Sequence, residues 1–295
     1  MAIVCCNRDN LYGHSFIVIV SQIIICQFIN FTPQITIVLP KILLSKNSSY
    51  AYKTAWINRI FATINVFSFY DILCFSFLLT LNRFVAIILP KYIVLFESTK
   101  LYFVLFFTWL TVFALTFVDF HYCTRSFQVS TLLWIRDCSK QSSDSGQVFL
   151  IFFYSCELFL SLTIFVMYCA IISTIRHRFT SIKNEAQTTD GRYGGHRMSM
   201  LENIKRERSM LILAAMTSGS LIISVILVGI LPMLLVKSFC QEGLITMNIL
   251  INLNVILGRC VLPTAFFLTN KRARKYLHSR LRNSVVKTTQ FQITK

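Results

Sequence analysis

The sequence predicts an all-α membrane protein with six helical crossings. Hydrophobic residues make up 55% of the 295-residue chain and charged residues only 14%, whereas ordinary soluble domains carry about 25% charged residues. The apolar stretches are about 20 residues or longer, which is the length that one helix needs to cross a bilayer. Backbone polar groups in lipid must bond to one another, and these stretches do not alternate as barrel strands do, so helices are predicted.

The chain divides into a short N-terminal segment, a transmembrane domain and a basic tail. We expect residues 1–14 to be cytoplasmic and residues 15–270 to form the transmembrane domain. Residues 271–295 combine apolar and cationic helix faces, which favours an amphipathic helix on the inner leaflet over an unstructured tail. The six predicted spans cover residues about 15–40, 60–82, 101–120, 147–175, 209–236 and 244–269.

The distribution of Lys and Arg predicts the orientation of the spans. With both termini in the cytoplasm, the inner segments hold 20 of these residues and the outer segments 8, as the positive-inside rule requires. This placement explains the net charge of +17 by membrane lipid and orientation, so no nucleic-acid partner is expected. The sequon at Asn47 then lies outside, where glycosylation is predicted. We expect a multi-pass protein of the plasma membrane.

The second predicted span ends in a short motif, which reads Asn82-Arg83-Phe84, then Ala86-Ile87, then Pro90. It resembles the Asp-Arg-Tyr motif of rhodopsin-like G-protein-coupled receptors, and more specifically the nematode serpentine chemoreceptors of class X. Other similarities are Cys123, Trp134 and Cys138 before the fourth span, and the ending LPTAFFLTNKRARKYL of the sixth. The alternative interpretation makes Arg83 a cationic anchor that reaches the lipid headgroups.

This resemblance implies a seven-transmembrane receptor-type helical bundle that lacks its first helix. The second predicted span would be the third receptor helix, so the chain would be a shortened receptor. Leu262 and Phe266 depart from the family pattern around Pro263, and Asn58 stands where a cysteine usually ties the outer loop to that helix. The resemblance implies a G-protein contact at Asn82, Arg83, Phe84, Pro90, Lys205, Arg206 and Arg208, and switch prolines at Pro232 and Pro263.

Three charged residues lie inside the predicted spans, where a charge facing lipid is costly. They are Asp71, Glu157 and Arg259. One interpretation pairs Asp71 with Arg259 as a structural or state-dependent lock. The other places Asp71 and Glu157, with Tyr70 and Tyr154, in a ligand pocket that favours a polar or cationic group.

The ten cysteines are too scattered for a disulfide scaffold or a zinc site. Cys123 and Cys138 share the outer loop before the fourth span, in an oxidising space. A bridge between these two is one interpretation, and two free thiols are the other. We expect no metal and no cofactor.

The leading functional prediction is a chemosensory-type receptor that binds an unknown small-molecule or peptide ligand and signals through a heterotrimeric G protein. A six-span transporter or channel is a second class, since the intramembrane charges would line a polar path. A non-signalling receptor remnant is a third. The chain carries no phosphate loop, nucleophile elbow or His-based metal motif, so we do not expect an enzyme.

Overall fold

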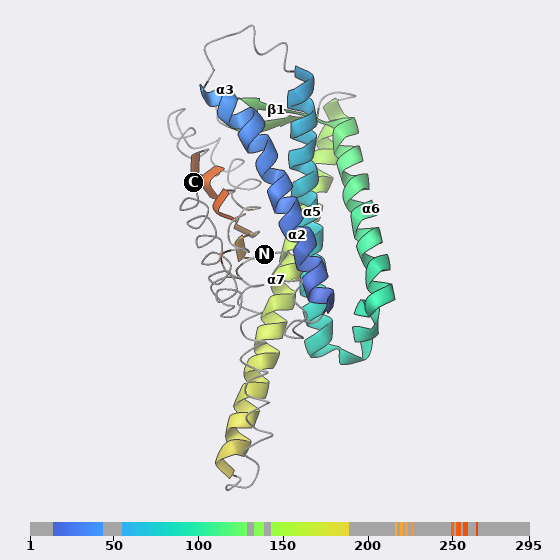
Figure 1. Cartoon of the computed structure of the whole chain (residues 1–295), viewed down its shortest axis with the longest axis vertical. Helices are drawn as coiled ribbons and strands as arrows, with labels where there is room; N and C mark the ends of the chain where they lie inside the picture. Colours follow the sequence, from blue (N-terminus) through green and yellow to red (C-terminus); the bar gives the residue numbers. More distant parts are fainter. Residues whose placement is uncertain are drawn as a thin grey trace, which may run out of the picture.

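The computed structural model describes four long helices and a β-hairpin (Figure 1). The described residues are 14–43, 55–128, 133–138, 143–188 and a few isolated positions between 216 and 264. Four of the helices are long and apolar enough to cross a membrane, which is compatible with the predicted membrane protein. These four correspond to the first four predicted spans, and most of residues 209–236 and 244–269 lie outside the described residues.

The first helix continues through a change of helical pitch. The α-helix α2 (His14–Pro33) passes into the π-helix η1 (Gln34–Val38) and then into the short α-helix α3 (Leu39–Leu43). Pro33 lacks an N–H and its ring clashes with the carbonyl four residues earlier, which disturbs the regular α-helical ladder. The π-helical turn of η1 begins directly after this proline, and both prolines and π-helical turns are recognised places where a helix bends.

The central element is α5 (Ala55–Ile88), which contacts each of the other three long helices. In its most apolar window 61% of the residues are buried, against 22% in α6 (Ser98–Tyr122) and 28% in α7 (Ser143–Thr188). The short 3₁₀-helix η2 (Pro90–Phe96) joins α5 to α6. We call this end of the bundle the η2 end.

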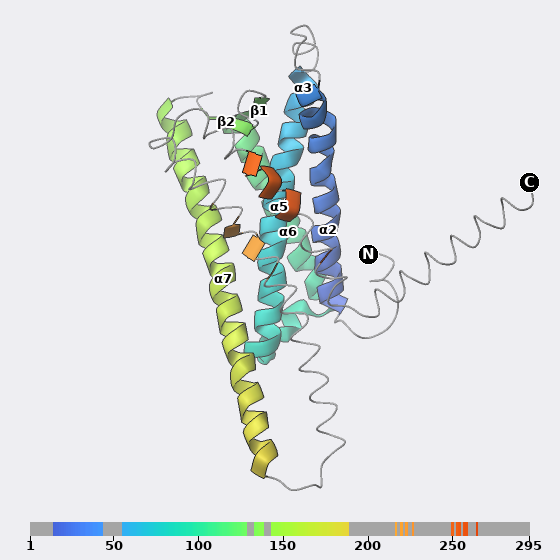
Figure 2. The ribbon, with the colours of Figure 1, turned by 90° about the vertical axis from the view of Figure 1, so that its left-hand side faces the viewer.

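Helix α7 is much longer than its neighbours. Its 46 residues extend about 69 Å at 1.5 Å per residue, more than twice the roughly 30 Å of a bilayer core. Its C-terminal part therefore projects beyond the η2 end of the bundle (Figure 2). Arg176, His177 and Arg178, all exposed, lie where α7 leaves the bundle.

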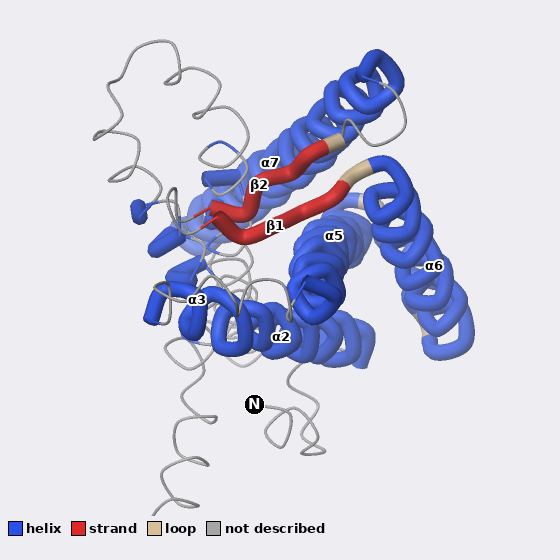
Figure 3. The backbone as a smooth tube through the Cα atoms, turned by 90° about the horizontal axis from the view of Figure 1, so that it is seen from above, coloured by secondary structure: helices blue, strands red, loops and turns tan. Residues whose placement is uncertain are grey.

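The hairpin differs from the predicted all-α fold. Strands β1 (Thr124–Gln128) and β2 (Leu133–Asp137) pair antiparallel and lie across one end of the bundle, between α5 and α7 (Figure 3). We call this the hairpin end. The sequence favours strands here, because the residues that face the bundle recur at every second position, as strand geometry requires.

Three apolar clusters hold the helices together. The largest joins α2, α5 and α6 near the η2 end and contains Phe16, Phe75 and Leu101. A second joins α5 to α7 through Ile72, Ile164, Tyr168 and Ile171. The third lies closer to the hairpin, and its buried members are Val66, Tyr70, Val112 and Phe153.

Candidate functional site

Arg83 lies near the C-terminal end of α5, at a junction of three helices. Its guanidinium carbon stands 4.1 Å from the centre of the Phe16 ring of α2, which is within cation–π range. On the other side, Tyr168 of α7 lies close enough for an electrostatic interaction with Arg83. The side chain is half-buried, so this arginine belongs to the contact between helices rather than to an open surface.

The neighbours of Arg83 in the motif point in different directions around α5. The Asn82 amide Nδ2 donates to the Ser15 hydroxyl of α2 at 3.3 Å. Phe84 packs against the cluster between α5 and α7. Arg178 of α7 donates from its guanidinium to the Ile87 carbonyl at 2.9 Å, which stabilises the carbonyl end of the α5 dipole.

The segment after the motif is exposed and mainly apolar. Pro90 stands at the first position of η2, where its missing N–H costs no helical hydrogen bond. Tyr92, Ile93, Val94 and Leu95 are exposed. Of the seven residues predicted to contact a G protein, the structure thus places Asn82, Arg83, Phe84 and Pro90 on one end of the bundle.

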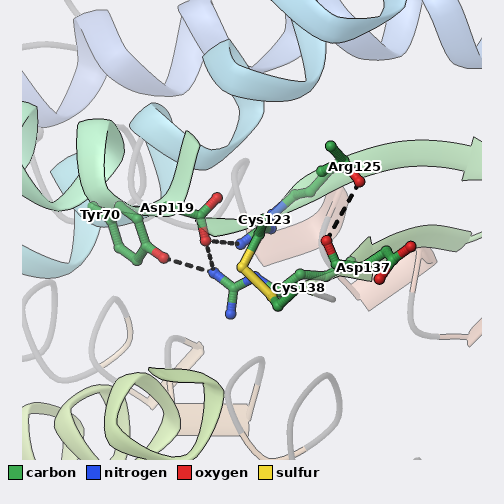
Figure 4. The surroundings of a disulfide bond; sticks show 8 residues. Tyr70, Asp119, Cys123, Arg125, Asp137 and Cys138 are labelled. Atoms are coloured by element: carbon green, nitrogen blue, oxygen red, sulfur yellow. Dashed lines mark hydrogen bonds and ion pairs between the residues drawn. A yellow bond between two sulfur atoms is a disulfide. The ribbon is translucent and has the colours of Figure 1, made fainter. Parts of the chain in front are cut away.

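At the hairpin end, two arginines hold one carboxylate. Arg125 of β1 and Arg136 of β2 are directly opposite in the strand register, and like charges in such a pair repel. Asp119 near the end of α6 offsets this repulsion, because its Oδ1 accepts from the Arg125 guanidinium at 3.3 Å and also from Arg136. We call Asp119, Arg125 and Arg136 the arginine clamp (Figure 4).

Of the three clamp residues, Arg136 contacts the largest number of elements described here. Its guanidinium donates to the Tyr70 hydroxyl of α5 at 2.8 Å and lies 5.3 Å and 5.9 Å from the ring centres of Phe153 and Tyr154 of α7. Burial by itself lowers the pKa of this guanidinium, but Tyr70, Asp119 and Glu157 raise it, and the net direction is upward. Arg136 therefore stays charged and links β2 to three helices.

The structure brings together three of the four residues predicted for a ligand pocket. Tyr70, Tyr154 and Glu157 all interact with Arg136. Glu157 is buried on α7, where the positive charge of Arg136 compensates its negative charge. These three residues and Arg136 form the polar centre of the hairpin end.

Asp71 is separated from that centre. It follows Tyr70 directly in α5, so its side chain leaves the helix about 100° away and lies beside Cys26 of α2. The side chain is completely buried, and the Cys26 thiol is close enough to its carboxylate for a weak hydrogen bond. Its predicted partner Arg259 lies outside the residues that the structure describes.

Cys123 and Cys138 are joined by a disulfide in the structure. This bond connects the end of α6 to the residue after β2 and lies beside Tyr70 and Asp119 (Figure 4). Gly146 of α7 approaches the Cys138 carbonyl so closely that a methyl group there would collide with the oxygen. The hairpin is thus tied covalently to α6 and packed directly on α7.

Several predicted residues lie outside the described part of the chain. Among the described residues, no group of His, Cys, Asp and Glu has the arrangement of a metal site. The predicted residues of which the structure gives no account are Asn47, Lys205, Arg206, Arg208, Pro232, Arg259 and Pro263.

The arginine clamp itself was not predicted. In the sequence, Arg125 and Arg136 are predicted only to be outer-loop charges, and no role is predicted for Asp119, which stands at the end of an apolar run. The available signal was the alternation of Arg125 with Phe127, matched by that of Trp134 with Arg136 in the second strand. No protein-family model matches the chain, and no curated protein matches it.

Proposed function

We propose that the chain is a multi-pass plasma-membrane receptor of the rhodopsin-like G-protein-coupled type, similar to the serpentine chemoreceptors of class X. It binds a small-molecule or peptide ligand between its helices and activates a heterotrimeric G protein. In this proposal the η2 end faces the cytoplasm and the hairpin end faces outward. The receptor identity rests on the sequence motif, and the described helices support it by their length and apolarity.

The observation that carries the proposal is the position of Arg83 between helices. A switch of this kind needs a helix contact with two arrangements and a side chain at the contact that is always charged. Arg83 fits that need, since Phe16 covers its guanidinium from α2 while Tyr168 approaches from α7. A movement of either helix would expose the guanidinium to a partner.

The charges around the η2 end support its cytoplasmic orientation. Lys91, Lys100, Arg176 and Arg178 are all exposed on this end of the described structure. Cytoplasmic loops of membrane proteins carry such an excess of Lys and Arg. The disulfide between Cys123 and Cys138, at the opposite end, agrees with an oxidising exterior.

The proposed ligand contacts are at the hairpin end of the bundle. Tyr70, Tyr154 and Glu157 offer hydroxyl groups and a carboxylate around Arg136. A ligand with a polar or cationic group can compete with Arg136 for Glu157. It would act only through a difference in its affinity for the two arrangements of the helices.

The test is basal G-protein activation in cells that express the full chain with a panel of Gα subunits. We expect Arg83→Gln to reduce activation at least tenfold while surface expression is retained. The matched control is Arg176→Gln, which removes an exposed arginine from the same end and leaves activation unchanged. If no Gα responds to the parent chain, or if its expression produces an ion or solute flux, the receptor proposal is wrong.

A further inference from the structure

A small surface pocket lies between α5, the end of α6 and β1, outside the polar centre described above. Arg59 and Val66 line it from α5, Asp119 and Phe120 from α6, and Arg125 from β1. The space inside it is about 20 Å³, which is room for about one water-sized group. Only a compact head group can enter it, and the rest of any ligand must stay at the mouth.

The charge in the pocket wall is unbalanced. Asp119 is the one acid among the described lining residues, and Arg125 and Arg136 already share it. Arg59 contributes a further positive charge, with its guanidinium carbon 4.6 Å from the centre of the Phe120 ring. Two arginines, Arg59 and Arg125, therefore line the pocket beside one carboxylate, that of Asp119, which favours the entry of an anion.

The hairpin also has an excess of hydrogen-bond donors. The Nε atoms of Arg125 and Arg136 and the Nε1 atom of Trp134 are buried, and none has an acceptor within the described part of the structure. Buried donors without acceptors are rare because each costs about 1–3 kcal/mol. Arg125 also lines the pocket.

We propose that this pocket binds the carboxylate head group of a small organic acid between Arg59 and Arg125. A guanidinium presents a planar fork of N–H donors that matches the two oxygens of a carboxylate. The pocket has room for about one carboxylate oxygen, and the second oxygen would lie at its mouth. Phe120, an exposed member of the lining, supplies apolar surface for the hydrocarbon part of the acid.

This site is distinct from the contacts proposed for receptor function, and its occupancy requires no G protein. The acid would bind on the α6 side of Asp119, whereas Tyr70, Tyr154 and Glu157 surround Arg136 on the other side of the clamp. By adding a second acceptor beside Arg125, the ligand would hold β1 more firmly against the bundle. Binding should therefore stabilise the folded chain.

The experiment is calorimetric titration of the purified full chain in lipid nanodiscs with sodium butyrate. We expect saturable binding in the millimolar range and a rise in the unfolding temperature on butyrate addition. Butyramide, which has a similar shape without the charge, should not bind, and sodium chloride or sodium sulfate at equal ionic strength should not reproduce the effect.

Arg59→Gln is the decisive variant, because Arg59 is exposed and its ring contact with Phe120 can be lost without disturbing the clamp. We expect it to weaken butyrate binding at least tenfold, and Arg59→Lys to weaken it less. The control Arg176→Gln removes an arginine from the opposite end and should bind as the parent does. Absence of saturable butyrate binding, equal binding of butyramide or chloride, or unchanged affinity in Arg59→Gln would each overturn the proposal.

Discussion

Asp119 compensates two arginines that face each other across the hairpin. Both members of the Asp119–Arg136 pair are nearly inaccessible, with side chains 4% and 9% exposed. The free-energy cost of desolvating such a pair is about as large as the free energy of its Coulombic attraction. The pair by itself therefore adds little stability. Removing one partner has a different effect, because the remaining charges stay buried without compensation.

The first prediction concerns this carboxylate. Asp119→Asn should lower the free energy of unfolding by about 3–5 kcal/mol, the range found when a buried ion pair loses one partner. The measurement is thermal unfolding of the purified protein in detergent. Glu97→Gln, which changes an exposed acid at the start of α6, should leave the unfolding temperature within error. An equal shift for both variants would show that Asp119 does not compensate the arginines.

A second prediction concerns the close contact of α7 with the hairpin. Gly146→Ala places a methyl group against the Cys138 carbonyl, and overpacking of this kind costs about 1–3 kcal/mol. Gly219 is the matched control, because a Cβ there meets no atom within 4 Å. We expect less folded protein for Gly146→Ala and no loss for Gly219→Ala, as measured by size-exclusion chromatography. Equal yields of both variants would contradict the described contact.

At the scale of elements, the disulfide and the arginine clamp both fix the hairpin to the end of α6. The bond spans 15 residues, and closing a loop of that length stabilises a fold by about 3 kcal/mol in the chain-entropy model. Lys41 adds a hydrogen bond from its Nζ to the Phe127 carbonyl at 3.4 Å. The hairpin is therefore fixed to the first, third and fourth of the long helices as well as to α5.

A third prediction follows for the paired cysteines. Replacement of both Cys123 and Cys138 by Ala should lower the unfolding temperature by an amount that corresponds to about 3 kcal/mol. Reducing agent should have the same effect on the parent chain and no effect on the double variant. The control replaces Cys156 and Cys169, which are free and exposed. A reducing agent that left the parent unchanged would argue against the bond.

The long helices could be predicted from the sequence, because their signal is local. The runs around Phe75, Trp109 and Ile164 are long and apolar, and lipid-compatible backbone has few other arrangements. The hairpin has a weaker local signal, since two five-residue strands are stabilised mainly by contacts with the helices beneath them. The alternation of side chains in TRSFQ and LWIRD nevertheless has the period of two that indicates a β-strand.

The candidate sites were less predictable, because they combine residues far apart in the chain. The meeting of Tyr70 with Arg136, 66 positions apart, depends on how the hairpin lies on α5. The motif at Arg83 was found by its resemblance, whereas its cover by Phe16 required the packing of α2 on α5. Sequence pattern thus identified Tyr70, Tyr154 and Glu157 on the helices, and it missed Asp119 of α6 and the two arginines of the hairpin.

For the whole molecule, the two ends of the bundle have different chemical character. The hairpin end has a disulfide and a buried ionic centre. The η2 end has exposed cations and the projecting part of α7. This polarity matches a helical bundle that crosses a membrane with its cationic end in the cytoplasm, and the proposed receptor function depends on that orientation.

The most direct test of this account is the side of the membrane on which the η2 end lies. Cysteine would be introduced at Lys91 of η2 and, in a second variant, at Gln128 of β1, both exposed positions. Intact cells would then be treated with a membrane-impermeant thiol reagent, with the parent chain as background. The account predicts labelling at position 128 in intact cells and at position 91 only after permeabilisation. Labelling at position 91 in intact cells would contradict it, because Arg83 would then have no access to a G protein.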